Sequence, residues 1–106
     1  MKQYTSPEQT AKLIELGLFP KHIKKISDGG KMLLECSGYS IGELIEMLPR
    51  VIEGDHHNSL LAIDSDNTKW WVMYLYMGKQ KYTSKSAELI DVLFDMVVKL
   101  KKEGVI

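Results

Sequence analysis

A chain of 106 residues with 44% hydrophobic and 26% charged residues has the length and composition of a single folded domain over residues 1–106. The formal net charge of zero argues against a strongly basic nucleic-acid binder. One cysteine cannot form an intrachain disulfide, and no apolar run reaches the roughly 20 residues of a membrane span. With no apolar signal-peptide core at the N-terminus, we expect a cytoplasmic protein without a membrane partner.

The first expected element is a helix over residues 7–16. Ser6 is a favourable N-cap, Pro7 suits the first helical position, and Gln9 completes a capping-box pattern. Gly17 stands where a helix commonly ends on a glycine in the left-handed conformation. The pattern therefore predicts both ends of this helix.

Residues 19–38 are the segment whose structure the sequence specifies least. We expect a single helical turn over residues 21–26 and a turn or loop at residues 28–30, where two glycines follow an aspartate. Residues 32–34 are apolar and fit either a short strand or a buried loop.

A second helix is expected over residues 41–48. Ser40 and Glu43 form another capping-box pattern, and Pro49 should stop the helix because it cannot continue the backbone hydrogen bonds. An apolar stripe at helical spacing supports this prediction; it consists of Ile41, Leu44, Ile45 and Leu48.

An antiparallel meander of about three strands is expected next. The strands are predicted over residues 60–63, 69–77 and 80–83, because each is rich in apolar, aromatic or β-branched side chains. A polar turn over residues 64–67 separates the first two strands. A two-residue hairpin loop over residues 78–79 separates the last two, with the glycine supplying a positive φ angle.

The longest helix is expected over residues 85–103, with Ser84 as its N-cap and Gly104 after its last turn. Because a three-stranded sheet with one bare apolar face is marginally stable, this helix should cover the meander. The predicted fold is therefore α+β: an antiparallel meander packed against a long C-terminal helix, with two shorter N-terminal helices.

The two faces of the long strand differ in chemistry, because successive side chains of a strand point to opposite sides. One face carries Trp70, Val72, Tyr74 and Tyr76, and the other carries Trp71, Met73, Leu75 and Met77. We assign the second, more aliphatic set to the core under the C-terminal helix. The first set is then either covered by the two shorter helices or partly exposed.

The aromatic face of this strand is the main candidate for a binding site. Such a face, with lysines nearby, can stack the bases of a single nucleic-acid strand; the candidate residues are Trp70, Tyr74, Tyr76, Lys69, Lys79 and Lys81. The neutral net charge and the short sheet favour core packing of the same aromatics. An exposed part of the face could instead contact another protein or a second copy.

No other residue pattern predicts a catalytic, metal or cofactor site. His56 and His57 follow Asp55, but neighbouring residues on an extended chain point apart and a zinc site needs three or four ligands. Residues 64–67 lack the later glycine and glutamate of a calcium loop. Cys36 stands beside an apolar run, where a cysteine usually packs as a small hydrophobic residue.

The order of several motifs resembles a group of short uncharacterised proteins from Bacteroides genomes, their phages and mobile elements. The motifs are Tyr4-Thr5-Ser6-Pro7-Glu8-Gln9, Leu16-Gly17-Leu18, Tyr39-Ser40-Ile41-Gly42-Glu43-Leu44, Met47-Leu48-Pro49, the Trp/Tyr-rich strand, and Glu103-Gly104-Val105-Ile106. The resemblance implies a small accessory protein of phage or mobile-element origin, and carries over no activity or site. We expect a non-enzymatic accessory or protein-interaction module; the alternative is a weak single-strand nucleic-acid binder.

Overall fold

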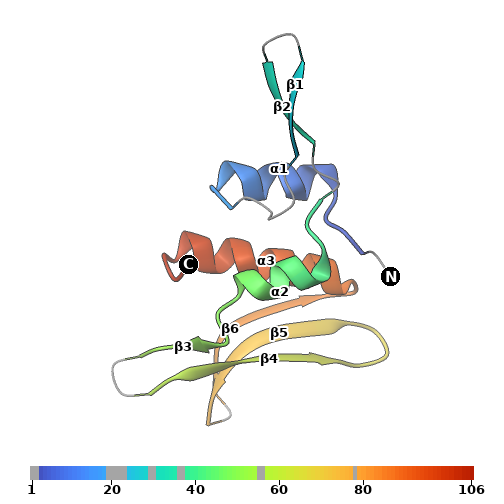
Figure 1. Ribbon diagram of the computed structural model, residues 1–106. Helices are drawn as coiled ribbons and strands as arrows, with labels where there is room; N and C mark the ends of the chain where they lie inside the picture. Colours follow the sequence, from blue (N-terminus) through green and yellow to red (C-terminus); the bar gives the residue numbers. More distant parts are fainter. Residues whose placement is uncertain (1–2, 19–23, 29–30, 36–37, 55–56, 78) are drawn as a thin grey trace.

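The computed structural model describes residues 3–18, 24–28, 31–35, 38–54, 57–77 and 79–106 (Figure 1). The helices and strands follow in the order α1 (Pro7–Glu15), β1 (Lys24–Asp28), β2 (Lys31–Glu35), α2 (Ile41–Met47), β3 (Val51–Ile52), β4 (Ser59–Ser65), β5 (Trp70–Tyr76), β6 (Lys79–Ser86) and α3 (Leu89–Lys102). The predicted α+β class, with a long helix at the C-terminal end, is confirmed.

The main sheet has one strand more than predicted. Its strands are all antiparallel and lie in the order β3-β4-β5-β6, so the predicted three-stranded meander is extended by β3 at one edge. In β3, Val51 lies opposite Leu60 and Ile52 opposite Ser59. This strand has only two residues. It is therefore too short to show the alternation of apolar and polar residues by which a strand is recognised in a sequence.

A separate hairpin forms within the segment that the sequence specified least. Strands β1 and β2 pair in register from Lys24 opposite Glu35 to Asp28 opposite Lys31, and the hairpin extends away from the rest of the fold (Figure 1). The predicted helical turn over residues 21–26 is therefore wrong for residues 24–26, whose backbone pairs with β2 instead. The strand alternative for residues 32–34 is confirmed, while residues 21–23 and 29–30 lie outside the described residues.

The helices stack in layers on one side of the four-stranded sheet. Helices α2 and α3 lie side by side next to the sheet, and α1 lies beyond them (Figure 1). Helix α3 is buried along most of its length because it packs against the sheet on one side and against other helices elsewhere. Its fully buried residues include Ile90, Leu93, Val97 and Leu100.

The ends of α1 and α2 agree with the predictions because their signals are local. Around α1, the Ser6 backbone N–H donates to Gln9 Oε1 at 2.9 Å and the Gln9 backbone N–H donates to Ser6 Oγ at 3.2 Å. Ser40 and Glu43 make the same reciprocal pair at the start of α2. Both capping boxes are confirmed.

The start of α3 differs from the prediction. The helix begins at Leu89 after Glu88, which makes no side-chain cap, and not at residue 85. Ser84, the predicted N-cap, lies inside β6 opposite Val72 and is buried. The predicted third strand over residues 80–83 is thus too short, because continued pairing with β5 keeps the chain extended as far as Ser86.

The face assigned to the core of the long strand is also corrected. Val72 and Tyr74 are fully buried in the main core, and Trp70 packs against it. Trp71, Met73 and Leu75 are outside that core, on the opposite side of the sheet. The prediction failed because it ranked the faces by aliphatic character; the aromatic face can lie under α3 because the tyrosine hydroxyl in its centre finds a hydrogen-bond partner.

The hairpin loop between β5 and β6 is shifted by one residue from its prediction. Tyr76 pairs with Lys79, so Lys79 is the first residue of β6 and not part of the loop, while Gly78 lies outside the described residues. Met77 has a φ angle of 46° and its side chain is 83% exposed. Met77, predicted to lie in the core, instead stands in solvent in a backbone conformation that disfavours non-glycine residues.

Candidate functional site

The structure divides the six candidate residues among three places. Tyr74 lies in the core with 0% exposure, and its hydroxyl donates a hydrogen bond to the Pro49 carbonyl at 2.8 Å. Burial raises the pKa of Tyr74 to about 12, which keeps this phenol neutral and a donor. Trp70 is half-buried against the same core. These two aromatics hold the fold together and do not form an open stacking surface.

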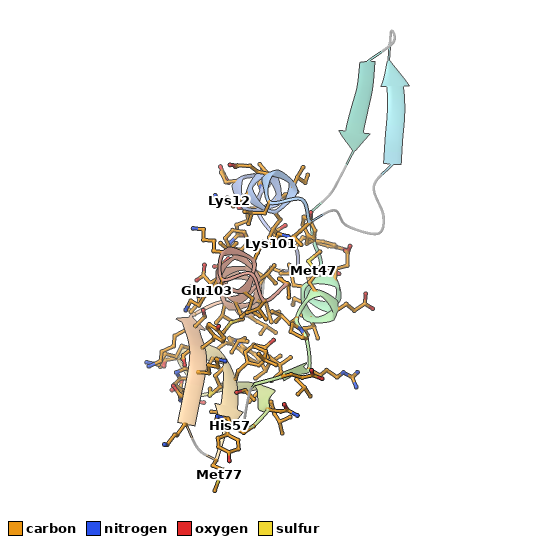
Figure 2. All side chains as sticks on the ribbon, turned by 90° about the vertical axis from the view of Figure 1, so that its left-hand side faces the viewer. Lys12, Met47, His57, Met77, Lys101 and Glu103 are labelled. Carbon is orange, nitrogen blue, oxygen red and sulfur yellow. The ribbon has the colours of Figure 1, made fainter. Side chains whose placement is uncertain are left out.

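Three of the candidates come together at one end of the sheet. Tyr76, Lys79 and Lys81 line a shallow pocket of about 340 Å³ together with Gly54, His57, Ser59 and Gln80. The rings of His57 and Tyr76 are stacked, with centroids 3.8 Å apart and planes inclined by 13°. Figure 2 shows His57 at the end of the sheet that is remote from the helices. The pocket therefore combines an aromatic stack with two lysines.

Lys69 lies at the opposite end of β5, away from this pocket. Its ammonium group is 5.5 Å from the centroid of the Trp71 ring, within the range of a cation–π contact. The turn that precedes it is held by Asp66, whose carboxylate accepts hydrogen bonds from the backbone N–H groups of Thr68 and Lys69 and from the Thr68 hydroxyl. These hydrogen bonds, led by that from the Thr68 hydroxyl, lower the pKa of Asp66.

The sheet face opposite the helices was not predicted as a site. We call it the outer face; it is defined by Val51, Leu60, Ala62, Asp64, Trp71, Met73, Leu75, Thr83 and Lys85, which share one side through the register of β3 to β6. Leu60 is 57% and Val51 40% exposed. Among the elements that the structure describes, all helices lie on the other side of the sheet (Figure 1).

The outer face combines an apolar centre with charges at its sides. Asp64 on β4 and Lys85 on β6 both lie in register with Trp71 on the strand between them. Met73 lies on the same face of β5, two residues after Trp71, and is only 9% exposed. Its sulfur accepts a 3.6 Å contact from Gln80 Nε2. A sequence signal for this face existed: β5 is apolar at both alternating sets of positions, as expected for a strand covered on both sides.

A second pocket lies between α3 and β6, where the helix packs on the sheet. It is lined by Ser84, Asp95, Val98, Lys99 and Lys102. The Lys99 ammonium donates to the Thr83 carbonyl at 2.7 Å and lies 3.4 Å from Ser84 Oγ, so it ties the helix to the edge strand. Burial, followed by the nearby Asp91 carboxylate, raises the pKa of Asp95, and Lys99 opposes this shift.

Residues that could hold a metal ion are not brought together in the described part of the chain. No group of three or more histidine, cysteine, aspartate or glutamate side chains occurs there in a suitable arrangement. Cys36, Asp55 and His56 lie outside the described residues. Among the described helices, none has the length and apolar character needed to span a membrane.

Comparison of the chain with protein-family models, with curated proteins and with solved structures finds no match. The outer face and the His57–Tyr76 pocket are the two features of this chain that bear on its function.

Proposed function

We propose that this protein is a small, non-enzymatic interaction module that associates with a second copy of itself through the outer face. The observation that carries the proposal is the one-sided helix cover of the sheet, which leaves Leu60 and Val51 exposed on the same face as Trp71 and Leu75. Apolar sheet faces of this kind are usually covered, and sheet-on-sheet packing is a common way to cover them.

The charges on the outer face favour a second copy over an unrelated partner. Asp64 and Lys85 lie on opposite sides of β5, both level with Trp71. A twofold axis parallel to β5 would place β4 of one copy over β6 of the other, so each aspartate would face a lysine of the partner copy. The two tryptophans would meet near the axis. A surface that complements itself in this way is what a symmetric dimer requires.

The alternative function, single-strand nucleic-acid binding on an aromatic sheet face, has less support. That function needs several exposed aromatics in a row, but Tyr74 is fully buried and Trp70 packs against the core. The origin in phages or mobile elements suggested by the sequence motifs stays an expectation. An accessory role in such an element is compatible with a small module that acts by association.

Substitution of an exposed leucine tests the proposed surface. Leu60→Glu places a charge within the contact and should lower the self-association constant by at least about tenfold. Ile45→Glu is the matched control, because Ile45 is a 37% exposed apolar residue on α2, away from the outer face. Sedimentation equilibrium measures both; an equal effect of the two substitutions would contradict the proposed surface.

Charge reversal tests the proposed geometry. Asp64→Lys and Lys85→Asp should each weaken self-association, because like charges then face each other across the twofold axis. An equimolar mixture of the two variants should associate again, since both facing pairs become opposite in sign. If neither variant alone differs from the wild type, the twofold arrangement is wrong even if the protein does self-associate.

A further inference from the structure

The pocket at the far end of the sheet lies on the helix-facing side but beyond the helices. Tyr76 follows Tyr74 by two residues on β5, so both rings are on the same side of the sheet. Whereas Tyr74 is fully buried, Tyr76 is only half-buried and packs on His57, which is exposed. Figure 2 shows His57 and Met77 together at this end, away from α3. An aromatic stack is thus available to a ligand there.

The described lining of the pocket is positively charged. Lys79 and Lys81 contribute to its lining, and none of its described lining residues is acidic. The ammonium of Lys81 is 5.8 Å from the centroid of the Tyr82 ring, a contact that leaves its charge unneutralised. Gln80 also lines the pocket, but its amide is engaged by Met73 and Thr83. Among the described lining residues, the two lysines are therefore the charged groups that a ligand meets.

We propose that this pocket binds one nucleotide unit, with the base on the His57–Tyr76 stack and the phosphate near Lys79 and Lys81. Aromatic stacking recognises any base, and lysine ammonium groups recognise phosphate as point charges. The volume of about 340 Å³ is at the lower end for small-molecule pockets, which fits one nucleotide and not a longer stretch. This ligand is either a free mononucleotide or one nucleotide of a single strand.

Amide NMR spectra of isotope-labelled protein test the proposal directly. Adenosine monophosphate should shift the amide signals of His57, Tyr76 and Lys81, while adenosine alone and inorganic phosphate alone should each bind about tenfold more weakly, since each lacks one of the two contacts. An oligodeoxyadenylate of about ten nucleotides distinguishes the two sources. Equal affinity of the two probes identifies a free nucleotide, and markedly tighter binding of the oligonucleotide identifies a strand. No shift at these amides with either probe overturns the proposal.

Variants separate a specific pocket from general attraction between charges. Tyr76→Leu and Lys81→Gln should each weaken binding of adenosine monophosphate by about fivefold to tenfold. Lys69→Gln removes the same charge at the opposite end of β5 and should leave the affinity unchanged. The native dispersion of each variant's amide spectrum verifies folding. If Lys69→Gln weakens binding as much as Lys81→Gln, the site is not in this pocket.

Discussion

The hydroxyl of Tyr74 donates a 2.8 Å hydrogen bond to the carbonyl of Pro49, which ties the centre of β5 to the segment after α2. Tyr74→Phe removes the hydroxyl donor and retains the ring. The Pro49 carbonyl then loses its hydrogen bond from Tyr74. The free energy of unfolding should therefore fall by about 1–3 kcal/mol. Urea unfolding followed by tryptophan fluorescence measures the change.

Tyr82→Phe is the control for this measurement. Tyr82 packs edge-on against Tyr74 with ring centroids 6.3 Å apart, but its hydroxyl has no hydrogen-bond partner among the described residues. Its substitution should change the free energy of unfolding by less than about 0.5 kcal/mol. If both variants lose the same free energy of unfolding, the hydrogen bond to the Pro49 carbonyl does not contribute to stability as predicted.

The same tyrosine predicts a pH dependence of stability. Its pKa is raised from 10.0 to about 12 by burial, so the folded state holds the phenolic proton more tightly than the unfolded state does. The stabilisation is fully present below pH 10 and is lost as the pH rises through about 12. The free energy of unfolding of the wild type should fall more steeply over this range than that of Tyr74→Phe. Parallel pH profiles would contradict this assignment.

The strained loop between β5 and β6 predicts a stabilising substitution. Met77 has a φ angle of 46° and is 83% exposed, so replacing it removes little packing. Met77→Asn creates an Asn-Gly pair, the preferred sequence for a two-residue hairpin loop. We expect the free energy of unfolding to rise by about 0.5–1 kcal/mol, as measured by thermal unfolding. Met77→Val should lower it, and the reverse order would exclude a positive φ angle at this residue.

Alanine substitutions at two glycines with positive φ angles distinguish the cost of backbone strain from the cost of steric overlap. A Cβ atom at Gly38 would lie 2.8 Å from the Thr5 carbonyl oxygen, whereas one at Gly17 would meet nothing within 4 Å. The Thr5 backbone cannot move away freely, because its N–H donates to the Tyr39 carbonyl at 3.0 Å. Gly17→Ala should cost about 1 kcal/mol of unfolding free energy, and Gly38→Ala clearly more. Similar losses would contradict the close approach of these segments.

The parts of the fold that the sequence predicts well depend on contacts between near neighbours. Both capping boxes and the glycine after α1 involve residues within about one helical turn of one another, so their patterns are visible in the sequence. The start of α3 depends instead on how far β6 stays paired with β5. Ser84 is a suitable cap by residue type, but pairing with Val72 places it in the sheet.

Alternation along β5 correctly separated its residues into two faces but could not say which face the helices cover. The choice of the aliphatic set ignored the polar partner that a buried tyrosine can find, here the Pro49 carbonyl 25 residues away in sequence. Long-range partners of this kind leave no periodic signal. An apolar pattern on both faces of β5 does indicate that the second face also needs a cover.

The sequence predicts only those parts of the candidate site that lie close together along the chain. Tyr76, Lys79 and Lys81 come together because they flank one hairpin loop, which the sequence marks with Gly78. His57 reaches Tyr76 from the loop before β4, and nothing in the sequence links the two residues. Lys69 adjoins Trp70 along the chain, but it lies at the opposite end of β5 from Tyr76.

The central claim, self-association through the outer face, is tested most directly by sedimentation equilibrium of the wild-type protein over roughly three decades of concentration. We predict that the average mass rises from the monomer value of 12.1 kDa towards twice that value as the concentration increases. A mass that stays at 12.1 kDa up to millimolar concentration would contradict the claim.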